Sequence, residues 1–201
     1  MLIALTALVF YLFICLFSYS PKDPGWSFSG GDGTIRNLGG HFGAWFADIM
    51  LQIFGYSAFL LPLVLVLFGW RVFRGLSGEQ PSLNRRLVHL GGIIVTVLAF
   101  SGIEHLHFAS LSAGMPFPAG GIFGDVITDW LARSFGDVGA TFTLIVAGVA
   151  GVTWSTDISW FVVMDVLGRE FYRLMAFLAT LPGTISDRYT GARSRKLRQV
   201  S

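Results

Sequence analysis

Few side chains in this sequence have the type and spacing that catalysis requires. A phosphate-binding loop needs a glycine-rich turn ending in Gly-Lys-Ser/Thr, because backbone amides and the lysine together surround the phosphates. The stretch GGDG at 30–33 has the glycines, but no strand precedes it, and Lys22 and Lys196 are the only lysines in the chain. We therefore interpret 30–33 as a flexible outer loop rather than a nucleotide site.

Candidate metal ligands gather at one place, where Glu104, His105 and His107 are near neighbours in sequence. Two histidines at i and i+2 do not share a helix face, and their spacing matches no zinc motif. We interpret them as interfacial residues at a helix end. Cys15 is the only cysteine, which supports neither a disulfide framework nor a soft-metal site. No metal or other cofactor is predicted for this segment.

Ser57 and His89 come closest to the pair that an intramembrane serine protease would need. Such chemistry requires both side chains at one membrane depth, within a hydrogen bond of each other. We expect Ser57 toward the outer end of one apolar block and His89 at the inner start of the next, most of a bilayer away. We therefore predict no catalytic residue here, so this segment is not an enzyme.

The elements that carry these residues are long and apolar. Hydrophobic residues make up 53% of the chain and charged residues 13%, with a mean hydropathy of +0.65, which is typical of a membrane protein. Because a spanning helix needs roughly 17–25 apolar residues, four blocks qualify. The predicted fold class is an all-α integral membrane protein with four transmembrane helices, at about 1–17, 49–70, 87–103 and 138–154.

Two features of these blocks affect the assignment. Pro62 lies inside the second block, where we expect it to kink the helix rather than break it. The first block could be a cleaved signal peptide instead of a span. It lacks a basic region before the apolar run, and 18–21 offers no small-residue cleavage pattern, so a span is the preferred interpretation.

The distribution of Lys and Arg predicts the orientation, since basic residues are retained on the cytoplasmic side. Basic residues concentrate between the second and third blocks and again after the fourth. The two remaining loops, 18–48 and 104–137, carry more acidic than basic residues and are expected outside. Both termini are therefore predicted to be cytoplasmic. The topology-setting residues are Arg71, Arg74, Arg85, Arg86, Arg193, Arg195, Lys196 and Arg198.

Two further helices are predicted to lie at the membrane surfaces. The run 120–135 places Ile122, Val126 and Trp130 four residues apart, which is typical of an amphipathic outer helix. The run 158–181 is also apolar, but Asp165, Arg169 and Arg173 form a charged stripe along it. A fifth span would bury that stripe and export the basic tail, so we expect a helix in the inner interface. The four-helix domain is then 1–182, and 183–201 begins a basic linker.

The spans carry small residues at spacings that let helices approach closely, namely Gly91, Gly92, Ala147 and Gly151. Packing within one chain and contact between subunits both fit this pattern. The spans carry no ionisable residue of the kind that marks a transport pathway. We therefore do not predict a carrier from the spans themselves.

A set of residues near the start of the chain resembles the signature region of FtsK-type bacterial DNA translocases. The stretch 119–124 (AGGIFG), the glycine-rich fourth block and 160–168 resemble the same family, so the resemblance covers nearly the whole chain. Gly25 departs from it, since the family often has serine there, and so does the absence of a basic tail before the first block. The signature residues are Tyr19, Pro21, Asp23, Pro24, Trp26, Asn37, Gly39, Gly43, Asp48, Gly55 and Pro62.

The resemblance implies a four-helix anchor in the bacterial inner membrane, enriched at the division septum. It also implies a hexamer, contacts with division proteins, and a RecA-like motor that uses ATP and Mg and binds DNA; these residues carry no Walker motif. The basic run 188–198 could contact DNA, but retention at anionic lipid is the plainer role. The alternative function is a stand-alone small membrane protein, either transporter-like or an assembly factor.

Overall fold

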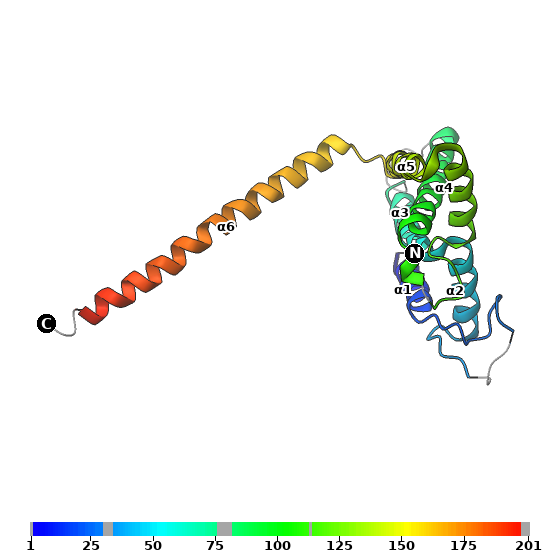
Figure 1. The fold of residues 1–201 in the computed structure, drawn as a ribbon, viewed down its shortest axis with the longest axis horizontal. Helices are drawn as coiled ribbons and strands as arrows, with labels where there is room; N and C mark the ends of the chain where they lie inside the picture. The colour runs from blue at the N-terminus through cyan, green and yellow to red at the C-terminus, as the bar shows by residue number, and fades with distance from the viewer. Residues whose placement is uncertain (1, 30–33, 76–81, 113, 198–201) are drawn as a thin grey trace. The chain divides into compact units, whose positions relative to one another are not determined.

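The computed structural model describes residues 2–29, 34–75, 82–112 and 114–197, and its secondary structure there is entirely helical. The chain divides into two units, Met1–Asp157 and Ile158–Ser201. The first unit gathers α1 to α5, with the long loop between α1 and α2 at one end (Figure 1). The second unit contains α6.

Helix α1, Leu2–Phe17, is the first predicted span. Its 16 residues rise about 24 Å at 1.5 Å per residue, which is near the lower limit for crossing a bilayer. Three other helical stretches among the described residues are long and apolar enough to cross, Gly40–Trp70, Leu83–His107 and Gly121–Thr156. The all-α prediction and the expected long apolar helices are thus present in the fold.

The second predicted span, 49–70, is wrong as one continuous helix. The structure has α2 at Gly40–Phe54, a 3₁₀ turn η1 at Gly55–Phe59 and α3 at Leu60–Gly75. Gly55 interrupts the helix because its φ of +61° is incompatible with an α-helix. Pro62 does not kink a helix here. It lies in the first turn of α3, where backbone N–H groups have no acceptor within the helix. The absence of an N–H on proline therefore costs no helical hydrogen bond there.

Helices α4, Leu83–His107, and α5, Gly121–Thr156, carry the remaining spans. α4 extends the predicted 87–103 at both ends. α5 is interrupted at Gly136, whose φ of +69° and ψ of 174° separate its two parts. The part before Gly136 corresponds to the predicted outer amphipathic helix, and the part after it to the fourth span. A glycine is needed there because L side chains rarely adopt that φ.

Two small apolar clusters lie among the described buried residues of the first unit. One joins α1, α2 and η1 through Leu16, Ala47, Leu51, Ala58 and Phe117. The second lies within α5, where Leu131 packs with Ala140 and Leu144 across the Gly136 break. Most other large apolar side chains are exposed on the protein surface, as expected when lipid rather than water surrounds the helices.

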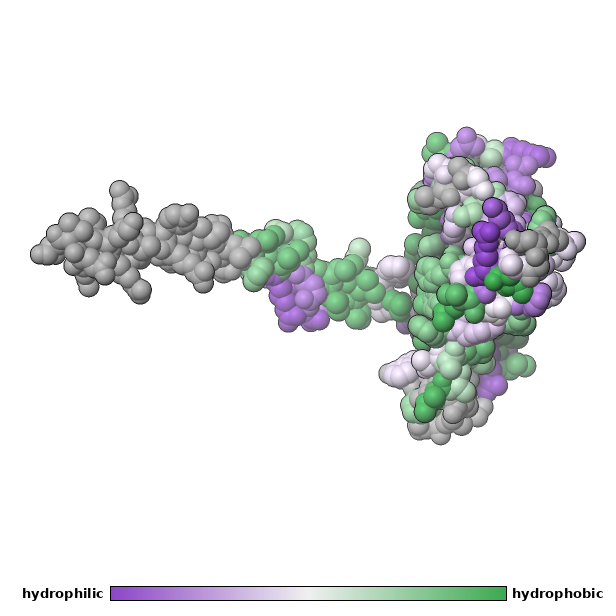
Figure 2. Space-filling view, turned by 90° about the horizontal axis from the view of Figure 1, so that it is seen from below, coloured by the Kyte–Doolittle hydropathy of each residue, from purple (hydrophilic) through white to green (hydrophobic). Residues whose placement is uncertain are grey.

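Helix α6 runs unbroken from Trp160 to Leu197 (Figure 1). The predicted interfacial helix was expected to end at 181, and the linker to begin at 183, but the helix continues through both positions. Figure 2 shows one hydrophilic patch on the otherwise hydrophobic described part of α6. Within α6, Glu170 and Arg173 form an i,i+3 ion pair at 2.6 Å.

Candidate functional site

The loop after α1 is organised around two buried side chains, Asp23 and Asn37. The Asp23 carboxylate accepts hydrogen bonds from the backbone amides of Arg36, at 3.0 Å, and Asn37, at 2.7 Å. The Asn37 side chain then donates to the Cys15 carbonyl at 2.8 Å and accepts from the Gly39 amide at 2.8 Å. One side chain therefore ties the end of the loop to α1 and to the start of α2.

Asp48, on α2, is the centre of a second buried cluster. Its carboxylate accepts from the Ser27 amide at 2.6 Å, the Ser27 hydroxyl at 2.7 Å and the Tyr19 hydroxyl at 3.2 Å. Burial, and then the neighbouring Asp48 charge, raise the pKa of Tyr19 well above its ordinary value. A Cβ at Gly25 would lie 2.7 Å from an Asp48 carboxylate oxygen, so glycine fits this arrangement as it stands.

These two clusters contain much of the predicted signature. Trp26 belongs to neither and exposes 57% of its surface. Pro21 and Pro24 lie in the turns around Asp23, the first exposed and the second half-buried. Gly39 and Gly43 pack against the Cys15 sulfur, where a Cβ at Gly43 would lie 2.9 Å from Sγ. Sequence reasoning missed the part played by Cys15, because a lone cysteine is not diagnostic of such contacts.

The last signature glycine, Gly55, lets two distant backbones meet. The Tyr56 amide donates to the Ala119 carbonyl at 2.9 Å, and a Cβ at Gly55 would clash with that carbonyl group. Gly121 opposes it with a φ of +62°, and a Cβ there would lie 2.6 Å from the Ile53 backbone. The stretch 119–124 and the break at Gly55 therefore form one glycine-lined crossing of η1 and α5.

The predicted metal candidates do not converge on one point. Glu104 accepts from the Ser57 amide at 2.8 Å, His105 lies 3.5 Å from Asp125, and His107 lies 3.0 Å from the Thr141 hydroxyl. No group of three or more His, Cys, Asp or Glu side chains in the described residues could hold a metal ion. Ser57 lies beside Glu104, far along α4 from His89, so this pair is not brought together.

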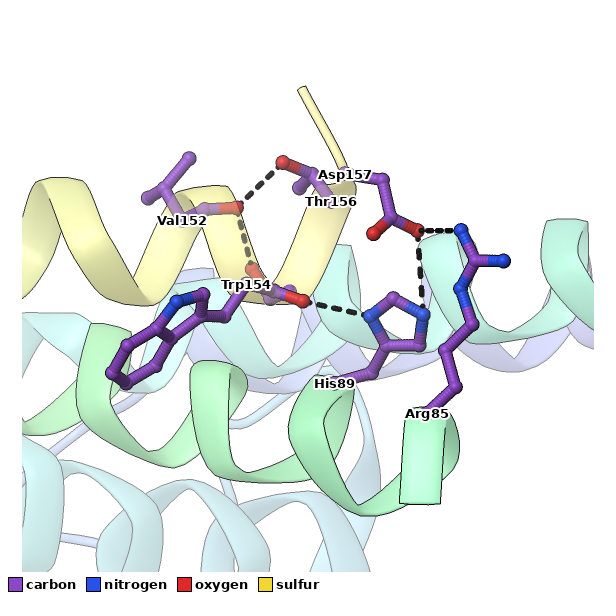
Figure 3. A network of polar contacts seen from close by, with 7 residues as sticks. Arg85, His89, Val152, Trp154, Thr156 and Asp157 are labelled. Carbon is purple, nitrogen blue, oxygen red and sulfur yellow. Dashed lines mark hydrogen bonds and ion pairs between the residues drawn. The ribbon is translucent and has the colours of Figure 1, made fainter. Parts of the chain in front are cut away.

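His89 instead belongs to a polar network at the other end of α4 (Figure 3). Its Nδ1 lies 2.7 Å from the Trp154 carbonyl, and its Nε2 lies 3.3 Å from Asp157. Both partners are hydrogen-bond acceptors, and each ring nitrogen faces one of them. Arg85 reaches the same Asp157 oxygen at 3.6 Å. This network holds the start of α4 against the end of α5, where Asp157 caps the helix with a φ of +56°.

The predicted helix-packing residues divide into two groups. Gly92 and Gly151 face each other, because a Cβ at Gly92 would lie 2.8 Å from the Gly151 carbonyl oxygen and one at Gly151 would lie 2.7 Å from the Thr96 nitrogen. They let α4 and α5 pack closely within one chain. A Cβ at Gly91 would meet nothing within 4 Å, and Ala147 is half-buried.

The predicted basic residues are only partly described. Arg85 takes part in the network above, and Arg86 is exposed. Arg198 and the loop 30–33 lie outside the described residues. Five other basic residues are in helices but have side chains outside the description, namely Arg71, Arg74, Arg193, Arg195 and Lys196.

Comparison with known proteins gives a consistent result. The family described as the 4TM region of DNA translocase FtsK/SpoIIIE matches residues 1–168. The DNA translocase FtsK of Pseudomonas syringae pv. tomato is 39% identical over 175 residues, covering 84% of this chain and 21% of that protein. That of Pseudomonas aeruginosa is 34% identical over 209 residues, covering 100% of this chain and 24% of that protein. The chain thus spans less than a quarter of these curated relatives. No solved structure matches it.

Proposed function

Because the chain belongs to the family of the 4TM region of DNA translocase FtsK/SpoIIIE, we propose that it anchors a DNA translocase in the bacterial inner membrane at the division septum. In this role it couples chromosome segregation to cell division. The observation that carries the proposal is the family match over residues 1–168. The buried clusters around Asp23 and Asp48 support it, because they give the signature residues a shared structural role.

The proposed anchor has both termini in the cytoplasm and associates into a homo-oligomer, a hexamer in the family's pattern. The first loop from 18 up to 34 and the loop 108–120 are the proposed contact surface for division proteins. Exposed aromatic residues such as Trp26 favour this, because large rigid side chains often dominate interfaces. ATP, Mg and DNA would be bound by a motor domain, whose motifs these 201 residues do not contain.

The size of the native protein tests the anchor against the alternative of a stand-alone membrane protein. An antibody against 114–137 would be used to blot membranes of the source cell. The proposal expects a band several times heavier than the 22.0 kDa of this chain. A single band near 22.0 kDa would rule out a covalently attached motor and favour the stand-alone protein.

Reporter fusions test the proposed orientation independently. An enzyme that is active only outside the cytoplasm would be inserted at 30–33, and the same enzyme at 76–81 would be the matched control. The positive-inside pattern predicts activity for the first fusion and none for the second. The reverse pattern would overturn the proposed topology without affecting the family assignment.

A further inference from the structure

The start of α2 packs beside the body of α1, at a point before that helix ends, and not beyond its C-terminal end. The Tyr11 hydroxyl donates to the Gly39 carbonyl at 2.8 Å, and the Tyr11 ring stacks with Phe42 at 6.3 Å. Tyr11 comes six residues before Phe17, the last residue of α1, which places it about 9 Å back along that helix. Since α1 is a membrane span, Gly39 and Phe42 are at the depth of a leaflet interior.

The C-terminal end of α2 likewise packs beside the body of a helix, α4, before that helix ends. The Ser101 hydroxyl donates to the Phe54 carbonyl at 3.1 Å, and Ser101 comes about 9 Å before the end of α4 at His107. α2 therefore connects α1 to α4 without emerging beyond either. Its buried face, which includes Gly43, Ala47 and Leu51, is turned toward the other helices of the unit.

The backbone amides and carbonyl just before α2 have hydrogen-bond partners within the protein, as a segment inside a membrane requires. Away from water an unpaired amide or carbonyl costs several kcal/mol, so irregular segments in lipid need internal partners. The amides of Asn37, Leu38 and Gly39 are bonded to Asp23, the Ser18 hydroxyl and the Asn37 side chain respectively. The Gly39 carbonyl accepts from Tyr11. A loop in water would not need this arrangement.

The outer face of this segment is mostly apolar, with His41 as an exposed polar side chain on it, and it continues the lipid-facing surface of α1. Leu38 exposes 79% of its surface, Phe42 60% and Trp45 52%. Leu38 lines a groove of about 530 Å³ together with Phe10 and Phe13 of α1. Because α1 spans the membrane, the space that Leu38 shares with it opens toward the side of that helix that faces lipid. The neighbouring Arg36 is exposed, and its long side chain can reach the headgroups.

We propose that α2 is an in-plane helix embedded in the leaflet at the C-terminal end of α1, with Leu38, Phe42 and Trp45 among the acyl chains. The groove beside Leu38 accommodates a lipid tail. The second predicted span then reduces to α3, and the water-exposed part of the first loop ends before 34 instead of at 48. This inference rests on the contacts of α1 and α4, and it does not depend on whether the chain anchors a translocase.

Cysteine labelling tests the position of Leu38. Leu38→Cys and Ser29→Cys would be introduced into the full chain in open membrane sheets and treated with a charged maleimide; the native Cys15 is fully buried and provides the background. Both new positions are exposed on the protein. We expect Leu38→Cys to react at least about tenfold more slowly than Ser29→Cys, because charged reagents are excluded from hydrocarbon, and both to react equally in SDS. Equal rates in membranes would overturn the proposal.

A second measurement separates lipid from a protein cover. Reconstitution with lipids brominated along the acyl chain quenches tryptophans that contact lipid tails. We expect the full chain to lose more fluorescence than its Trp45→Phe variant does. If Leu38→Cys is protected but the two proteins quench equally, a second copy or another protein covers this face, and the lipid assignment is wrong.

Discussion

At the scale of single residues, the signature of this chain is a set of hydrogen-bonding and close-packing requirements. Asp23 and Asp48 are buried carboxylates whose oxygens accept several hydrogen bonds, and Asn37 links the loop to α1. Gly55 and Gly121 provide positive φ and room for a backbone crossing. Each of these residues has a contact within the folded unit that gives it a structural role.

Asp48→Asn is expected to weaken the fold by about 1.5–3 kcal/mol, because charge-assisted hydrogen bonds to Ser27 and Tyr19 are lost or reversed. The matched control is Asp129→Asn, whose ion pair with Arg133 is exposed and worth at most about 1 kcal/mol. Unfolding midpoints in detergent would compare them. Equal midpoints for the two variants would contradict a structural role for Asp48.

Gly55→Ala is expected to be more damaging than Gly40→Ala. Both glycines have positive φ, but a Cβ at Gly40 would meet nothing within 4 Å, whereas one at Gly55 would clash with the Ala119 carbonyl. Backbone strain alone costs about 1–2 kcal/mol, and overpacking adds about 1–3 kcal/mol. The yield of folded protein and its unfolding midpoint measure the difference. Similar losses of stability for the two variants would show that Gly55 and the Ala119 carbonyl are not in close contact.

Tyr19 should make stability depend on pH in the alkaline range. Its pKa is raised in the folded protein above the ordinary 10.0, so only the unfolded chain ionises it just above pH 10.0, and the free energy of unfolding falls there. Unfolding midpoints at about pH 8 and about pH 11 would show a larger drop for the wild type than for Tyr19→Phe. Other alkaline titrations are common to both proteins. Equal drops would contradict the buried position of Tyr19.

At the scale of helices, α4 and α5 form the tightest pair, since Gly92 and Gly151 bring their backbones together and the network of Arg85, His89 and Asp157 joins their ends. Periodicity and length predicted both helices and the separate amphipathic helix before Gly136. The break of the second span at Gly55 was missed, because a glycine within an apolar run is also common in spanning helices. Only the contact with Ala119 shows why this glycine interrupts the helix.

Gly92→Ala should disrupt the α4–α5 pair, whereas Gly91→Ala should not. A Cβ at Gly92 would overlap α5, costing about 1–3 kcal/mol, while one at Gly91 meets open space and gains helix propensity of up to about 1 kcal/mol. Resistance to unfolding in SDS would rank the variants. If Gly91→Ala alone impairs the protein, its position is instead a contact between subunits.

The candidate site was only partly predictable from the sequence for a related reason. The resemblance identified Asp23, Asn37 and Asp48, but nothing in their spacing indicated that they bond to backbone amides and to Tyr19 rather than to an external ligand. Such partners depend on how the loop folds back onto α1, and a pattern of apolar blocks does not encode that path. The helix α6 likewise continues past its predicted end, although Pro182 and Gly183 are poor helix formers.

At the scale of the whole molecule, the chain combines apolar helices, a polar scaffold at one end of α1 and a long separate helix, α6, with a charged patch. The family match over residues 1–168 assigns this organisation to the 4TM region of DNA translocase FtsK/SpoIIIE. The relatives extend well beyond the matched segment, so the proposed anchor role concerns the part of the protein that meets the bilayer.

The most direct test of this account is the location of the segment in dividing cells. Residues 1–201 fused to a fluorescent protein would be imaged in the source organism beside an unrelated multi-span membrane protein that carries the same label. The account predicts enrichment at division sites for the fusion and a uniform envelope signal for the control. A fusion that inserts in the membrane but is spread as evenly as the control would contradict the proposed septal anchor.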